Sequence, residues 1–206
     1  MKLYHHPVSN NCRRVLVAAE LLDTELETEQ VDLMSGKNRD PAFLALNPNG
    51  KVPTLVDGDT RLWESNAIIQ YLADRHGETE LYPRDPARRA DIARWQFWAS
   101  AHLAPPVDTL AFERTLKSAL GMGEPDEVAI ARATDGVERF LPVLNESLEG
   151  RDYLAGEALT LADVSLIATL SYADAAQLRL ENYPNINAWR DRLEASDAFK
   201  AHQVGL

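Results

Sequence analysis

The sequence predicts two domains of different class, an α/β domain over residues 1–80 and an all-helical domain over residues 86–206. Residues 1–80 alternate short strand patterns with helical patterns, whereas no strand pattern follows residue 86. Residues 82–86 hold two prolines in five positions, which is typical of a linker. The length of 206 residues, with 45% hydrophobic and 26% charged residues, is that of a folded globular protein.

The elements of the first domain follow in the order β-α-β, a short helical turn, then β-β-α. Apolar residues three and four positions apart predict helices, and short apolar runs predict strands. Asp57-Gly58-Asp59 separates two such runs and indicates a hairpin, because glycine adopts the positive φ of a tight turn. We expect strands at residues 2–5, 26–33, 53–56 and 61–63, and helices at 12–22, 41–46 and 65–77.

Helical patterns alone follow the linker. Pro105-Pro106 separates the first two of them and is expected to break or kink the chain, because proline lacks the N–H that a helix interior needs. Pro142 is expected to kink the third helix for the same reason. We expect helices at residues 87–100, 107–120, 125–148, 160–177 and 184–194.

Composition excludes several classes of function. A net charge of −11 disfavours nucleic acid and anionic membranes as partners. The single cysteine, Cys12, cannot form an internal disulfide or a cysteine-rich metal site, and the five histidines lack metal-ligand spacing, so no metal is expected. No apolar run reaches the roughly 18 residues of a membrane span, and the first residues lack a signal-peptide core. We therefore expect a cytoplasmic protein.

Four short motifs carry a family resemblance. They are Ser9–Arg13, Asn47–Leu55, Leu62–Ile68 and Leu159–Val164. In this order and spacing they make the whole chain resemble the glutathione S-transferase superfamily, nearest to its serine-type theta- and delta-like or nu-like members. The resemblance implies a thioredoxin-like N-terminal domain that binds glutathione and an all-α C-terminal domain that forms the wall of the electrophile site. It also implies a homodimer, glutathione as co-substrate and a role in detoxification.

The glutathione-binding residues come from two motifs. The bond before Pro53 can be cis at low cost, and the resemblance implies a cis turn whose Val52 backbone pairs with the tripeptide. Ser65 is expected to cap the helix that follows it, where free N–H groups attract a carboxylate. By resemblance, Ser65 holds the γ-glutamyl carboxylate and Glu64 the glutamyl ammonium. Lys51 is a candidate for the glycyl carboxylate, although this contact stays open, as it does for the nearby loop residues Lys37 and Asn38.

Ser9 is the expected catalytic residue. A hydroxyl at a helix N-terminus donates to a bound thiolate and lowers the thiol pKa from about 8.5 towards neutrality. The resemblance supports Ser9 in two ways, because serine-type members place it before a Cys-Arg pair and nu-type members use Thr-x-Asn. The second pattern adds Asn11 as an assisting residue. Cys12 is the less favoured alternative, since beta-type members form a mixed disulfide there, and Tyr4 lies too early in the chain.

Two further sets of residues were singled out. His102 and Phe112 are the candidates for the electrophile site, although aromatic residues at helical spacing more often belong to the core. Thr160 and Asp163 have the spacing of a capping box, which indicates a role in stability. On that reading, Asp163→Ala costs about 0.5–2 kcal/mol and leaves glutathione affinity unchanged.

Three functions are consistent with these residues. The first is a glutathione transferase that conjugates glutathione to small hydrophobic electrophiles. The second keeps the site but performs disulfide or peroxide reduction, isomerisation or dehalogenation. The third is a non-catalytic adaptor, which has no need for Ser9, Val52-Pro53 and Glu64-Ser65 together. The sequence does not identify the second substrate, because fold alone does not set specificity.

Overall fold

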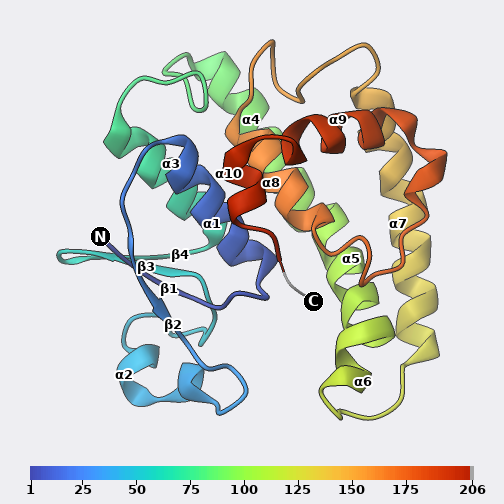
Figure 1. Ribbon diagram of the computed structural model, residues 1–206, viewed down its shortest axis with the longest axis horizontal. Coiled ribbons are helices and arrows are strands. Elements are labelled where there is room, and N and C mark those ends of the chain that lie inside the picture. The colour runs from blue at the N-terminus through green and yellow to red at the C-terminus, as the bar shows by residue number, and fades with distance from the viewer. Residues whose placement is uncertain (205–206) are drawn as a thin grey trace.

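Four strands near the N-terminus form one sheet in the computed structural model, which describes residues 1–204 (Figure 1). The sheet order is β2-β1-β3-β4. Strands β1 and β2 are parallel, whereas β3 runs antiparallel to both β1 and β4. The strands are β1 (Lys2–His5), β2 (Glu27–Gln30), β3 (Thr54–Asp57) and β4 (Thr60–Trp63).

Helices cover both faces of this sheet. Successive residues of a strand point to opposite faces, so Leu3 enters the core while the ring of Tyr4 packs edge-on against Phe43. Helices α1 (Asn10–Leu21) and α3 (Ser65–His76) pack against each other on one side, and α2 (Pro41–Leu44) lies on the other (Figure 1). This arrangement confirms the thioredoxin-like N-terminal domain.

The rest of the described chain is helical, which confirms the all-α C-terminal domain. Within residues 1–204, no helix is long and apolar enough to cross a bilayer. The helices are α4 (Pro86–Trp98), α5 (Ala104–Ala111), α6 (Lys117–Ala119), α7 (Glu127–Ser147), α8 (Leu161–Leu170), α9 (Pro184–Glu194) and α10 (Asp197–Ala201).

The expected break at Pro105-Pro106 is wrong. A π-helical turn, Ala99–Leu103, joins α4 to α5, and the N–H of Ala104 donates to the carbonyl of Ala99. The two prolines follow this turn directly, at the second and third residues of α5, where the wider π-helical bonding locally replaces the regular α-helical pattern. The helical path therefore continues without interruption.

Helix α8 is shorter than expected. The sequence pattern extends to residue 177, but the helix ends at Leu170 and turns follow. The hydroxyl of Ser171 donates to the carbonyl of Ala168, and Gln177 adopts a φ of +50°. These local bonds compete with continued helix formation. The short helix α10 was not expected either.

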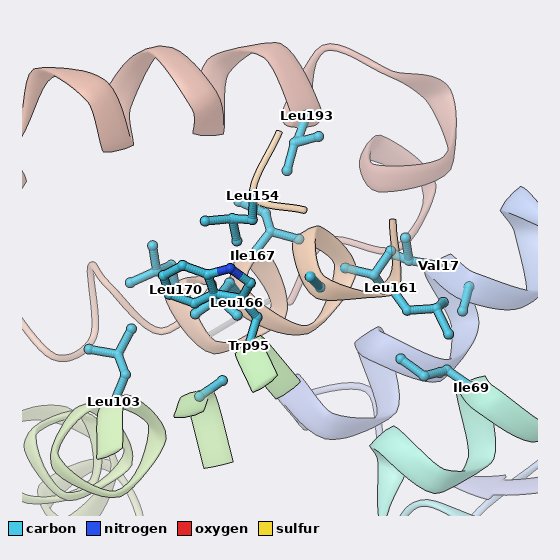
Figure 2. Close-up of a cluster of buried hydrophobic side chains, with 14 of the residues drawn as sticks. Val17, Ile69, Trp95, Leu103, Leu154, Leu161, Leu166, Ile167, Leu170 and Leu193 are labelled. Carbon is cyan, nitrogen blue, oxygen red and sulfur yellow. The ribbon is translucent and has the colours of Figure 1, made fainter. Parts of the chain in front are cut away.

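Every residue of α8 is buried. Figure 2 shows its side chains at the centre of the apolar core, in contact range of side chains from several other helices. It contacts α1, α3, α4 and α5. The labelled core residues in Figure 2 are Val17, Ile69, Trp95, Leu103, Leu154, Leu161, Leu166, Ile167, Leu170 and Leu193. A helix without a solvent-facing side must satisfy all its polar groups internally.

The start of α8 meets this requirement through the expected capping box. The side chain of Asp163 accepts hydrogen bonds from the N–H and the hydroxyl of Thr160 at 2.9 and 3.0 Å. It also accepts from the N–H of Leu154 and from Nε1 of Trp189, each at 2.9 Å. Asp163 therefore ties together α8, the preceding loop and α9.

Asp163→Ala is expected to lower the free energy of unfolding by about 3–5 kcal/mol. The loss exceeds that of a simple cap because several buried donors lose their acceptor, at about 1–3 kcal/mol each. Urea titration measures it, with Asp135→Ala, an exposed aspartate on α7, as the control. A loss below about 1 kcal/mol would contradict the role given to Asp163.

Candidate functional site

The bond between Val52 and Pro53 is a cis peptide, immediately before β3. It confirms the turn that the resemblance implied. Within residues 1–204, neither the N–H nor the C=O of Val52 makes a hydrogen bond to the protein. Since unpaired backbone groups seek a partner, they are available to an extended ligand.

Side chains on either side brace this turn. The amide of Asn47 donates to the carbonyl of Lys51 at 2.7 Å and to the hydroxyl of Thr54 at 3.1 Å. Asn38 donates to the carbonyl of Gly50 at 2.8 Å. Gly50 has a φ of +61°, and a Cβ there would lie 2.8 Å from the carbonyl oxygen of Asn38. The turn therefore depends on glycine and is held in one shape.

A cleft beside this turn brings together six of the residues named from the sequence. Asn47, Asn49 and Trp63 also line it, although the sequence did not mark them as site residues. Polar side chains dominate the lining, as expected for a charged, peptide-like ligand. Its lining is Asn11, Asn47, Asn49, Lys51, Val52, Pro53, Trp63, Glu64 and Ser65.

The expectation that Ser65 caps α3 is wrong. Glu64 occupies the cap position, with φ +69° and ψ 107°, and its side chain makes no capping bond. A positive φ is strained for a residue with a side chain and is commonly found at functional sites. Ser65 is instead the first helical residue, and its hydroxyl donates to Oδ1 of Asn11 at 3.1 Å.

Arg14 is the functional residue that the sequence reasoning missed. Its guanidinium is buried and donates to Asn11 at 2.7 Å and to Ser65 at 2.5 Å. The second nitrogen donates to the carbonyl of Ser165 at 3.1 Å and to the hydroxyl of Thr169 at 3.3 Å, both on α8. The sequence signal for Arg14 was a charged residue among the positions that form the buried face of α1.

The charge of Arg14 is not neutralised by a direct partner. Among the described residues, no carboxylate lies within ion-pair distance of it, although Glu64 and Asp108 contribute weaker favourable fields. Burial lowers the pKa of Arg14 to about 10. The guanidinium stays charged at neutral pH, so it gives the Ser65 end of the cleft a positive potential that attracts an anion.

Ser9 is the N-cap of α1. Its Oγ accepts a hydrogen bond from the N–H of Cys12 at 3.2 Å. Within the described chain its own hydroxyl has no acceptor other than the buried Cys12 thiol, and the N–H of Asn11 is unpaired. Ser9 does not line the cleft itself, but it lies two residues from Asn11, which does.

Cys12 is 1% exposed. Burial raises the pKa of its thiol to about 11, despite hydrogen bonds with Ser9 and the N–H of His6. About one thiol in ten thousand is then ionised at pH 7, which makes Cys12 a poor nucleophile.

The two candidate electrophile residues are not brought to the cleft. The ring of His102 lies 5.1 Å from that of Phe140, in a separate groove between α5 and α7. Phe112 begins a second π-helical turn and lines neither this groove nor the cleft. Lys37 pairs with Asp40 at 3.7 Å, away from the cleft. Among residues 1–204, no three His, Cys, Asp or Glu side chains are grouped to hold a metal.

Comparison with known proteins agrees with this fold. Residues 3–80 match the family model of the glutathione S-transferase N-terminal domain, and residues 99–197 match that of the C-terminal domain. The chain therefore belongs to the glutathione S-transferase superfamily.

Solved structures of the family resemble the whole chain. Glutathione transferase F7 from Populus trichocarpa is 27% identical, with a TM-score of 0.90 over 100% of this chain and 99% of that one. A glutathione S-transferase from Pseudomonas fluorescens is 33% identical, with a TM-score of 0.86 over 96% of each chain. Glutathione S-transferase-I with lactoylglutathione bound is 26% identical, with a TM-score of 0.88 over 98% of this chain and 97% of that one.

Arg14→Met is expected to change the free energy of unfolding by no more than about 1 kcal/mol, because the desolvation cost of the lost cation offsets its hydrogen bonds. The matched control is Arg13→Met on the same helix. Arg13 is equally buried but forms two bonds to Glu194, at 2.9 and 2.8 Å, and its loss is expected to cost about 2–4 kcal/mol. Equal losses in urea titration would argue against an uncompensated Arg14.

Proposed function

We propose that this chain is a glutathione transferase that ionises the thiol of glutathione and adds it to a small hydrophobic electrophile. The observation that carries the proposal is the unpaired Val52 backbone beside Glu64 and Ser65 in one cleft, with the buried Arg14 bonded to Ser65 behind it. Family membership supports glutathione transferase activity in general, and the polar lining of the cleft supports glutathione as the ligand.

Each part of glutathione has a matching group in the cleft. The γ-glutamyl carboxylate would meet the hydroxyl and N–H of Ser65, at the start of α3 and next to the Arg14 charge. Its ammonium would meet the carboxylate of Glu64. The cysteinyl segment would pair with the Val52 backbone as an added strand. Lys51, which is exposed and lines the cleft, is our candidate for the glycyl carboxylate.

The reaction proceeds through the thiolate. The thiol proton leaves to solvent, and the Ser9 hydroxyl then donates to the sulfur anion, assisted by the nearby N–H and amide of Asn11. The sulfur electron pair forms a bond to the electrophilic carbon. In a substitution, the leaving group departs with the electrons of the bond that breaks.

The helical domain, residues 86–206, would form the wall of the electrophile site, and residues 1–80 would bind glutathione. His102 and Phe112, the contacts expected from the sequence, do not line the cleft, so other residues of the helical domain would supply that wall. Mixed-disulfide chemistry at Cys12 is disfavoured by the burial of its thiol. Detoxification of reactive small molecules is the role that this chemistry suits.

A homodimer is the second part of the proposal. Phe97 on α4 is 74% exposed, and Trp63 on the edge strand β4 is 41% exposed. The side chain of Asn66, at the start of α3, donates to the carbonyl of Gln96 and the hydroxyl of Ser100 on the α4 side. Trp63 and Phe97 therefore lie next in sequence to segments that meet in one contact between domains, and a second copy would cover both side chains.

Ser9→Ala is expected to lower kcat/KM with a chromogenic aryl halide about 10- to 100-fold, because a hydrogen bond to the thiolate is lost. Cys12→Ala is the matched control in the same turn and is expected to keep activity within about threefold. The reverse pattern would assign the chemistry to Cys12. If the wild type shows no thermal shift with millimolar glutathione, the result favours the non-catalytic adaptor function instead.

Phe97→Glu is expected to convert a dimer into a monomer, because it places a charge in a desolvated contact. Sedimentation velocity measures the change. Val128→Glu, at a side chain 61% exposed on α7, is the control and is expected to leave the dimer intact. A dimer that survives Phe97→Glu would place the interface elsewhere.

A further inference from the structure

The segment that carries Ser9 is attached to the helical domain at both neighbouring residues. The hydroxyl of Tyr172, in the turn after α8, donates to the carbonyl of Val8 at 2.6 Å. The same oxygen accepts a hydrogen bond from the N–H of Asn10 at 3.4 Å. One phenol oxygen thus spans the peptide units on either side of Ser9.

A second contact reinforces this attachment. The side-chain amide of Asn10 donates to Oδ1 of Asp108 on α5 at 3.0 Å, and Asn10 is 4% exposed. Residues 8 and 10 are therefore held from the helical domain, while Ser9 between them makes its own capping bond to Cys12. Fixing both neighbours restricts where the Ser9 side chain points.

The hydrogen bonds at the N-terminus of α1 show which N–H and O–H donors remain available to a ligand. Tyr172 satisfies the N–H of Asn10, and Ser9 satisfies that of Cys12. In the described chain, the N–H of Asn11 is unsatisfied, and the hydroxyl of Ser9 has only the buried Cys12 thiol as an acceptor. On the proposed function, these two groups are the donors for the bound thiolate.

We propose that Tyr172 is a positioning residue for the thiol-activating serine, acting from the helical domain through the peptide units around Ser9. The inference rests on the proposed function, because positioning matters for a bound thiol. Burial raises the pKa of Tyr172 to about 12, so the hydroxyl stays protonated and keeps donating to Val8 throughout the neutral range. Asp108 and Cys12 also raise this pKa through their charges.

Tyr172→Phe tests the proposal, because it keeps the ring and removes the hydroxyl. The decisive readout is the pKa of the bound glutathione thiol, followed by thiolate absorbance against pH. We expect this pKa to rise and kcat to fall roughly tenfold, with KM for glutathione within about twofold, since Lys51, Glu64 and Ser65 are untouched. A loss of packing alone would not shift the thiol pKa.

Tyr71→Phe is the matched control. Its hydroxyl also donates to a single partner, Asp57, at 2.7 Å, but lies on α3 outside the cleft lining. It is expected to leave the thiol pKa and kcat unchanged. In a Ser9→Ala background, Tyr172→Phe is expected to have no further effect on the thiol pKa, because both changes act through Ser9.

The possible outcomes separate the two proposals. If the wild type does not bind glutathione, the proposed function and this inference both fall. If it binds and Tyr172→Phe ionises the bound thiol like the wild type, the inference alone is overturned. Amide exchange in ligand-free protein gives an independent test. The N–H of Asn10 is expected to exchange faster in Tyr172→Phe than in Tyr71→Phe, and equal rates would also overturn the inference.

Discussion

The complete burial of α8 is the constraint on which the rest of the structure depends. A helix without a wet face needs an internal partner for each polar group, and the partners of α8 come from both domains. Asp163 joins its start to α9 through Trp189, while the carbonyl of Ser165 and the hydroxyl of Thr169 accept from Arg14 on α1. Arg14 therefore connects α1 of the N-terminal domain to the buried helix, in addition to the bonds that the helix makes within itself.

Arg14 bonds both to α8 and to two residues of the cleft, which explains why a charged side chain is buried here. Arg14 contributes little to stability, because burial penalises its charge, but it places positive potential under Ser65 and Asn11. The chain carries a net charge of −11, so an anionic tripeptide would otherwise be repelled. On the proposed function, local positive charge from Arg14, Lys51 and the start of α3 offsets that repulsion at the cleft. Glu64, whose positive φ is strained, lines the same cleft.

The sequence predicts those parts that short segments encode by themselves. The Thr160–Asp163 capping box was predicted from its spacing, because its geometry is set within a few residues, whereas the cis Val52–Pro53 turn was implied by the family resemblance. Arg14 was missed since its partner Ser165 is 151 residues away, and no local pattern reports that pairing. Tyr172 was assigned to a continuing helix for the same reason, as its partner Val8 lies 164 residues away. The expectation that Ser65 caps α3 was wrong because its hydroxyl forms hydrogen bonds with Arg14 and Asn11 and not with the start of the helix.

A crystal structure with glutathione bound tests the central claim most directly. The account expects the γ-glutamyl carboxylate at Ser65 above Arg14, the cysteinyl backbone paired with Val52, and the sulfur within hydrogen-bond distance of the Ser9 hydroxyl. A sulfur placed against Cys12, or a tripeptide bound away from the Val52 turn, would contradict it.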